Sequence, residues 1–238
     1  MHFLLRNTHP EWHTLLEHCL ETMDVNYLKN LQEHNDYLPA RENLLAAFAS
    51  PLKSTHYILL GESPYPRAAS ANGYAFWDAA VDSLWSSTGL SKAVNRATSL
   101  RNWVKMLLLA RGELDGDFSQ PAIASIDKTL LMPTAEAFFK GLIQKGFLLL
   151  NATPVYSPGK VHYHARMWRP FIDKLFVELN TCRPDIQLVL FGRIATQVAT
   201  SGLPVGLQCE HPYNVSFITN ADALAFFKPL NLLGIPHE

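Results

Sequence analysis

Polar side chains that can bind ligands or move protons follow four short apolar stretches of this 238-residue chain. The four stretches are residues 56–60, 147–150, 187–191 and 207–210. They are followed, in this order, by residues 61–65 (GESPY), by Asn151, by Gly192 and Arg193, and by His211 and Pro212. Short, largely apolar runs are typical of buried parallel strands. The carboxyl ends of such strands meet at one edge of a sheet. We therefore expect the functional site at that edge.

Apolar residues at helical spacing separate these stretches. The predicted helices are 12–23, 40–49, 100–108 with Ser99 as its N-cap, 168–179, 194–198 and 222–227. Residues 111–135 are rich in turn formers, and we expect a surface excursion there. Strands that alternate with helices predict an α/β fold with a central four-stranded parallel sheet flanked by helices and a helical N-terminal segment. The hydrophobic content of 48% is enough for one core, so we expect a single domain over residues 1–238.

The composition excludes several classes of protein. Twenty Lys and Arg against 21 Asp and Glu provide no bulk positive field, so any DNA contact needs a local patch. Cys19, Cys182 and Cys209 form no CxxC pair and suggest neither a disulfide framework nor a four-cysteine cluster. No apolar run reaches the ~18 residues of a membrane span, and the first ten residues do not read as a secretory signal. We therefore expect an intracellular, cytoplasmic protein without membrane association.

Motifs of one enzyme family occur in order along nearly the whole chain. They are YILLGESPYP at 57–66, NGYAF at 72–76, TSLRNW at 98–103, LLLN at 148–151, WRPF at 168–171, VLFG at 189–192 and HPYNVS at 211–216. These segments resemble the GQDPYH, HGLAF, PSLxN, LLLN, WEQF, LLWGS and HPSPLS motifs of the uracil-DNA glycosylases. The chain most resembles the classical family-one enzymes, and the resemblance covers residues 12–233. It implies the fold of that family.

The resemblance also implies a monofunctional hydrolase that removes uracil everted from DNA and leaves an abasic site. Phe76 would stack on the everted ring, Asn151 would hydrogen-bond the pyrimidine edge, and Tyr65 would exclude the 5-methyl group of thymine. His211 would act as a neutral donor to the developing uracil anion. The implied partner is DNA that contains uracil or another damaged base. We expect no cofactor, no metal and a monomeric protein.

A second set of residues is implied to hold the DNA backbone. Its members are Ser99, Gly192, Arg193, Pro212 and Val215. Ser99 would use a helix N-terminus, where free amides favour phosphate. Val215 would be the apolar wedge inserted where the base leaves, and Gly192 would allow a close approach of the backbone. Arg193, Lys160 and Arg166 are candidates for the positive patch.

The chain departs from the family pattern at the catalytic aspartate, where it has Ser63. A serine is uncharged and is a poor base, and a positioned general base contributes about 10²–10⁴-fold in rate. We therefore expect slower excision or an altered base specificity. Glu62 is the first candidate for a replacement carboxylate, and Asp78 and Asp82 are weaker candidates.

The loop that follows His211 departs as well. Tyr213 and Asn214 replace Ser-Pro, and Val215 is a smaller wedge than leucine. We expect an altered grip on DNA, with weaker flipping or a preference for another form such as single strands.

Each of these residues also has a purely structural explanation. Phe76 and Tyr65 are of types common in cores, Asn151 is a common turn residue, and Ser99 is an ordinary helix cap. Two rival functions stay open on the sequence alone. One is a glycosylase for another lesion, such as hypoxanthine, and the other is a DNA-binding or adaptor protein that keeps the fold and excises no base.

Overall fold

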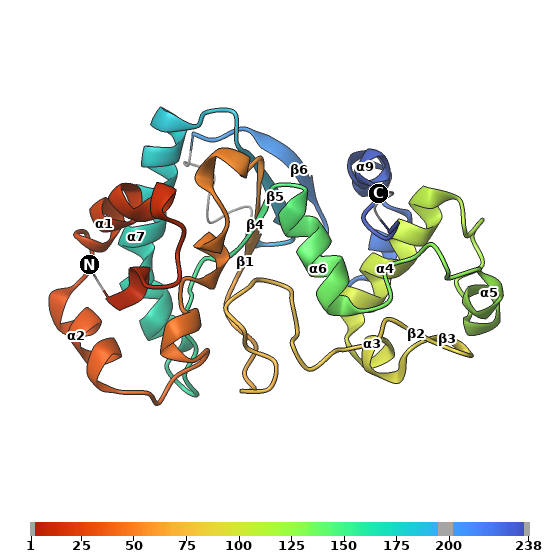
Figure 1. Cartoon of the computed structure of the whole chain (residues 1–238), viewed down its shortest axis with the longest axis horizontal. Helices are drawn as coiled ribbons and strands as arrows, with labels where there is room; N and C mark the ends of the chain where they lie inside the picture. Colours follow the sequence, from red (N-terminus) through yellow and green to blue (C-terminus); the bar gives the residue numbers. More distant parts are fainter. Residues whose placement is uncertain (1–2, 195–201, 236–238) are drawn as a thin grey trace. The chain divides into compact units, whose positions relative to one another are not determined.

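Four short strands form a central parallel sheet in the order β4-β1-β5-β6, flanked by helices (Figure 1). The strands are β1 (Tyr57–Gly61), β4 (Phe147–Asn151), β5 (Gln187–Phe191) and β6 (Val205–Cys209). In the register of β1, Gly61 lies opposite Asn151, and Leu60 lies opposite Leu190. The carboxyl ends of these three strands therefore lie side by side. The predicted fold class is confirmed.

The computed structural model describes residues 3–194 and 202–235. These residues form two compact units. The first unit falls within Met1–Asp78, Gly146–Leu190 and Ile194–Gly206, and the second within Ala79–Lys145, Phe191–Arg193 and Leu207–Glu238. The single domain over residues 1–238 stays a prediction. The helix expected at 194–198 lies, beyond Ile194, outside the described residues.

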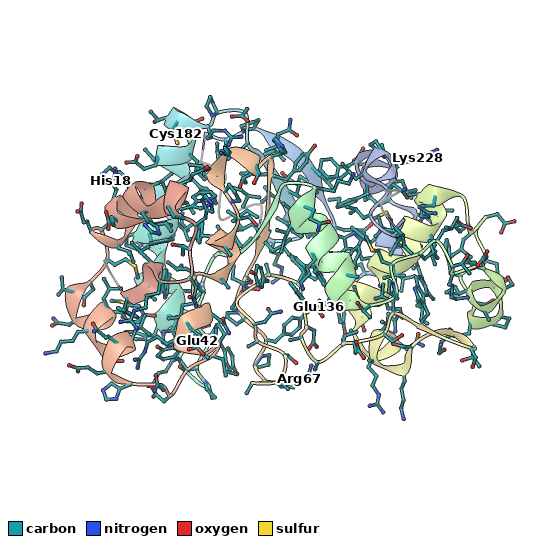
Figure 2. All side chains as sticks on the ribbon, in the orientation of Figure 1. His18, Glu42, Arg67, Glu136, Cys182 and Lys228 are labelled. Carbon is teal, nitrogen blue, oxygen red and sulfur yellow. The ribbon has the colours of Figure 1, made fainter. Side chains whose placement is uncertain are left out.

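The first unit contains α1 (His13–Leu20), α2 (Val25–Glu33) and α7 (Val161–Cys182). Helices α1 and α7 lie side by side (Figure 1), and Nδ1 of His18 on α1 is 3.6 Å from Oε1 of Glu178 on α7. Figure 2 labels His18 on α1 and Cys182 at the last residue of α7. Trp12 and Trp168 are fully buried in one apolar cluster with residues of β1 and β4. This cluster fixes the two strands that end at the candidate site.

The second unit contains the remaining described helices and a small hairpin. They are α3 (Lys92–Arg96), α4 (Thr98–Arg111), α5 (Gln120–Ser125), α6 (Ala135–Gln144), α9 (Ala221–Phe227), β2 (Trp85–Ser86) and β3 (Gly89–Leu90). The ring of Trp103 on α4 lies 5.6 Å, centroid to centroid, from each of Phe138, Phe191 and Phe227, and all three contacts are edge-on. Such aromatic contacts are stabilising beyond the area they bury, so Trp103 anchors α4 in this unit.

Two predicted helix boundaries were wrong. Ser99 does not cap α4, because α3 ends at Arg96 and Ala97 serves as the cap between the two helices, so that Ser99 lies in the first turn. Residues 40–49 do not form a continuous helix. They form two 3₁₀ turns, at Arg41–Asn43 and Ala46–Ala49, because the buried Leu45 between them has a non-helical backbone (φ −115°, ψ 28°).

Other elements were not predicted. The presumed surface excursion at 111–135 contains α5, which Ser119 caps. Helix α6 follows it, capped by Thr134, whose side chain accepts a hydrogen bond from the backbone N–H of Ala137. Helix α2, capped by Asp24, and the β2–β3 hairpin were missed as well. No helix in the described part of the chain is long and apolar enough to cross a membrane.

A buried chain of hydrogen bonds links α2 to α7 in the first unit. Trp168 Nε1 donates to the hydroxyl of Tyr27 (3.0 Å), and that hydroxyl lies 2.8 Å from Nδ1 of His164. His164 Nε2 lies 3.1 Å from Oγ of Ser157, which donates to the carbonyl of Asp36 (3.2 Å). Because Ser157 has its only proton committed to that carbonyl, His164 Nε2 must donate. The Tyr27 hydroxyl accepts from Trp168 and directs its own proton to Nδ1 of His164, so Nδ1 accepts. The network therefore requires a neutral imidazole.

We expect the stability of the protein to fall as the pH drops below about 6.5, the ordinary pKa of histidine. Burial, and then the nearby Lys160, lower the pKa of His164 in the folded state. The unfolded state therefore binds a proton first, and the free energy of unfolding decreases by up to about 1.4 kcal/mol per pH unit for this one group. Chemical denaturation between pH 7 and 5 measures the slope, which His164→Gln should reduce. His162→Gln, at an exposed residue of the same helix, is the control and should keep the wild-type slope. Equal slopes in wild type and His164→Gln would contradict the prediction.

Candidate active site

The ends of β1 and β4 bring an amide and an aromatic ring together in the first unit. A Cβ atom placed on Gly61 would lie 2.8 Å from Oδ1 of Asn151, 2.8 Å from Cβ of Ala75 and 3.6 Å from Cε2 of Phe76. Only glycine leaves room for these groups at the end of β1. The side chains of Asn151 and Phe76 therefore flank the same small volume.

The backbone of Phe76 has an unusual conformation. Its φ is +63°, in the left-handed region that residues other than glycine rarely adopt. Two hydrogen bonds hold this segment: Tyr65 Oη donates to the carbonyl of Phe76 (3.2 Å), and the N–H of Ala75 donates to the carbonyl of Leu149 in β4 (3.0 Å). Strain of this kind persists where surrounding structure fixes it, and it occurs often at functional sites. The two hydrogen bonds therefore hold the ring of Phe76 beside the end of β4.

Tyr65 is a neutral hydrogen-bond donor at this site. Burial, with a smaller contribution from the Asp78 carboxylate, raises the pKa of Tyr65 to about 12. Asp78 itself is buried and accepts a hydrogen bond from Arg67 (2.8 Å). Figure 2 labels Arg67 on the loop that follows β1. The charge of Asp78 is therefore committed to this ion pair, which weakens Asp78 as a replacement for the missing carboxylate.

Asn151 is a buried residue whose amide has unused hydrogen-bonding capacity. The residue is only 3% exposed, and within the described residues its side chain makes no hydrogen bond. Its amide atoms are not among the fully buried unpaired side-chain atoms of the described residues, so a ligand from solvent can reach them. An amide offers one acceptor oxygen and two donor hydrogens. This arrangement suits a ligand that presents a donor beside an acceptor.

The turn that carries Glu62 and Ser63 is fixed through its backbone. The carbonyl of Gly61 accepts from the N–H of Ala152 (2.8 Å), and the carbonyl of Glu62 accepts from the N–H of Thr153 (3.0 Å). The side chain of Glu62 is exposed, and Ser63 is half-buried. The turn therefore has a defined backbone whichever side chains it carries.

In the second unit, Gly192 lies against His211. Gly192 has φ +68°, and a Cβ atom there would lie 3.1 Å from Cβ of His211. The N–H of Gly192 also donates to the carbonyl of Cys209 at the end of β6 (2.9 Å). Glycine thus permits both the left-handed turn after β5 and the close approach to His211.

The hydrogen bond that His211 accepts defines its tautomer. The backbone N–H of Tyr213 donates to Nδ1 of His211 (3.0 Å). In a neutral imidazole that accepts at Nδ1, the proton resides on Nε2. His211 can therefore donate from Nε2 without carrying a charge.

Asn102 is a positioning residue that the sequence did not single out. It is 1% exposed, and its Nδ2 donates to the carbonyls of Pro212 (2.8 Å), Tyr213 (3.3 Å) and Asn214 (3.3 Å). One side chain on α4 therefore holds the loop that begins at His211. The only sequence signal was its place in the TSLRNW segment.

The remaining predicted DNA-contacting residues also belong to the second unit. Ser99 is half-buried in the first turn of α4, and Arg193 follows Gly192 after β5. Pro212 is buried, whereas Val215 is 69% exposed at the start of a 3₁₀ turn.

Lys160 and Arg166 lie in the first unit, at and near the start of α7. Nζ of Lys160 is 3.6 Å from Oδ2 of Asp36, and the guanidinium of Arg166 lies over the ring of Tyr163. A positive patch shared with Arg193 stays a prediction, as do the roles of all the site residues.

The predicted site residues thus fall into two groups. The first unit holds Glu62, Ser63, Tyr65, Phe76 and Asn151, and the second unit holds Ser99, Gly192, Arg193, His211, Pro212 and Val215. Among the described residues, no three His, Cys, Asp or Glu side chains are arranged to hold a metal ion. The first group can bind a flat polar ring, and the second can donate a proton or a hydrogen bond from a neutral imidazole.

Comparison with known proteins finds similar structures and sequences. The chain superposes on the wild-type UNG crystal structure from Nitratifractor salsuginis with a TM-score of 0.93 and 43% identity, over 97% of this chain and 95% of that one. It is 30% identical to a uracil-DNA glycosylase of Thermobifida fusca over 169 residues, 70% of this chain and 61% of that protein. It is 25% identical to a uracil-DNA glycosylase of Fusobacterium nucleatum over 194 residues, 78% of this chain and 71% of that protein. No family model matches the chain.

Proposed function

Because this chain belongs to the uracil-DNA glycosylase family, we propose that it hydrolyses the N-glycosidic bond of uracil in DNA and leaves an abasic site. The observation that carries this proposal is the amide of the buried residue Asn151, which makes no hydrogen bond within the described residues and lies beside the ring of Phe76. An aromatic face next to a donor–acceptor pair suits a flat pyrimidine.

Base recognition follows from this pair. Uracil presents an N3–H donor beside the O4 acceptor, which match Oδ1 and Nδ2 of Asn151. Cytosine presents the opposite order, an N3 acceptor beside an amino donor, and does not pair with the amide in this orientation. Tyr65, fixed by its bond to the Phe76 carbonyl, is the candidate that excludes the 5-methyl group of thymine by a steric clash.

We assign the chemical step to a dissociative cleavage. The C1′–N1 bond breaks with both electrons going to uracil, and a water molecule then adds to C1′ and releases a proton. The Nε2–H of His211 stabilises the uracil anion by a hydrogen bond as its charge develops. A neutral imidazole is suited to this role because its N–H can stabilise the anion while the imidazole itself carries no charge. DNA with uracil, or another base that fits the same amide, is the proposed partner.

Release of free uracil from a uracil-containing oligonucleotide tests the proposal. We expect Asn151→Ala to lower the single-turnover rate by about 10² or more, since it removes two hydrogen bonds made inside a buried site. Asn30→Ala, which changes an exposed asparagine of α2, is the matched control and should keep the wild-type rate.

Three outcomes would contradict the proposal in different ways. Release of hypoxanthine but not uracil from a panel of single-lesion oligonucleotides would favour the other-lesion glycosylase. Tight binding of uracil-containing DNA without any base release would favour the adaptor protein. Equal rates for wild type and Asn151→Ala would exclude the assigned recognition residue.

A further inference from the structure

The loop that starts at His211 is braced from several sides. The backbone N–H of Tyr213 donates to Nδ1 of His211, and the carbonyl of Tyr213 accepts from Asn102. The hydroxyl of Ser216 donates to the carboxylate of Glu210, which joins the two ends of the loop. The backbone of this loop is therefore fixed without any help from the side chain of Tyr213.

Two large apolar side chains of this braced loop are exposed. Tyr213 is 67% exposed and Val215 is 69% exposed, whereas Phe217 and Ile218, two and three residues beyond Val215, are buried. Burial of Phe217 and Ile218 anchors the loop to the core of the second unit. The exposed ring of Tyr213 contributes little apolar burial to the fold, and it is accessible to a partner that reaches this loop.

We propose that Tyr213, rather than Val215, is the main wedge, and that its ring stacks on a base of duplex DNA next to the everted nucleotide. This inference rests on the proposed function. Proteins that distort DNA insert apolar side chains between base steps, and an aromatic ring stacks on any base. The side chain of valine ends at Cγ, whereas the ring of tyrosine extends well beyond it. A fixed backbone on both sides of residue 213 aims the ring without a large loss of entropy on binding.

Substitutions at the two positions separate the two wedges. Removal of an aromatic side chain that stacks on one base lowers binding of the nucleic acid by about 5- to 150-fold. We expect Tyr213→Ala to lower kcat/KM for uracil release from a duplex by at least about tenfold, Tyr213→Phe to stay near wild type, and Val215→Ala to cost less than Tyr213→Ala. Leu130→Ala, at an exposed apolar residue of the second unit, controls for the loss of a surface apolar side chain. Unchanged thermal unfolding of Tyr213→Ala checks the fold.

A binding measurement makes the test independent of catalysis. A duplex with a tetrahydrofuran abasic site beside 2-aminopurine reports on stacking through its fluorescence. Wild type and Tyr213→Phe should change this fluorescence, and Tyr213→Ala should not. If wild type releases no uracil but shows this difference, the proposed function fails and the wedge stands. If wild type releases uracil while Tyr213→Ala matches it in rate and fluorescence, or Val215→Ala is the more damaging change, the wedge assignment is overturned.

Discussion

His211→Ala lowers the single-turnover rate of uracil release by about 10²–10³-fold, the usual cost of removing one donor to a developing anion. The geometry accounts for the size of this effect. The N–H of Tyr213 donates to Nδ1 of His211, so the proton of the neutral imidazole is on Nε2, the atom that we assign to the leaving group. Alanine removes that donor, and no other group of the loop replaces it in our mechanism.

The companion variants identify the interaction that is lost. His211→Gln can present an amide N–H and should recover part of the rate, whereas exposed His162→Ala should have no effect. Because the interaction forms with the anion rather than with bound uracil, kcat should fall while KM changes little. A selective increase in KM at constant kcat would assign His211 to substrate binding instead.

Ser63→Asp raises the rate of uracil release by about 10²–10⁴-fold, the range attributed to a positioned general base. A carboxylate at residue 63 can orient the attacking water and stabilise positive charge on the sugar. The turn accepts this change because its neighbours are held by backbone bonds from Ala152 and Thr153, which the substitution does not touch. Single-turnover excision of uracil from a duplex measures the gain.

Two further variants show whether charge is responsible. Ser63→Asn has nearly the shape of aspartate without the charge and should give no comparable gain. Glu62→Gln tests whether the adjacent exposed carboxylate already does this work, in which case it slows wild type strongly and Ser63→Asp adds little. Asp78 is a poor substitute because Arg67 binds it. A rate of Ser63→Asp at or below the wild-type rate would reject the assigned geometry.

Much of the sheet could be predicted from the sequence because β1, β4 and β5 are short and largely buried, although β6 buries only Leu207. All five residues of β4 are buried, so an unbroken apolar run marked the strand and placed Asn151 at its end. The helices were harder to predict. Gly141 lies within α6 and Pro133 precedes it, so signals that usually mark turns hid a helix that Thr134 caps. At α4, the end of the preceding helix moved the cap from Ser99 to Ala97.

In the candidate site, the sequence predicted only the residues that occupy motif positions. Side chains such as Phe76 and His211 occupy motif positions, but the left-handed backbone of Phe76 and the tautomer of His211 depend on hydrogen bonds formed in the folded chain. Asn102 shows the limit most clearly. Its partners are backbone carbonyls up to 112 residues away, and a backbone carbonyl leaves no trace in the amino-acid types.

The turn after β1 has a consequence for protein engineering. Its carbonyls at Gly61 and Glu62 are held by main-chain amides alone, so the scaffold does not depend on which side chains occupy positions 62 and 63. A library randomised at these two codons can therefore vary reactivity while most members still fold. Selection from such a library for release of non-natural bases would start from a turn whose backbone tolerates substitution at positions 62 and 63.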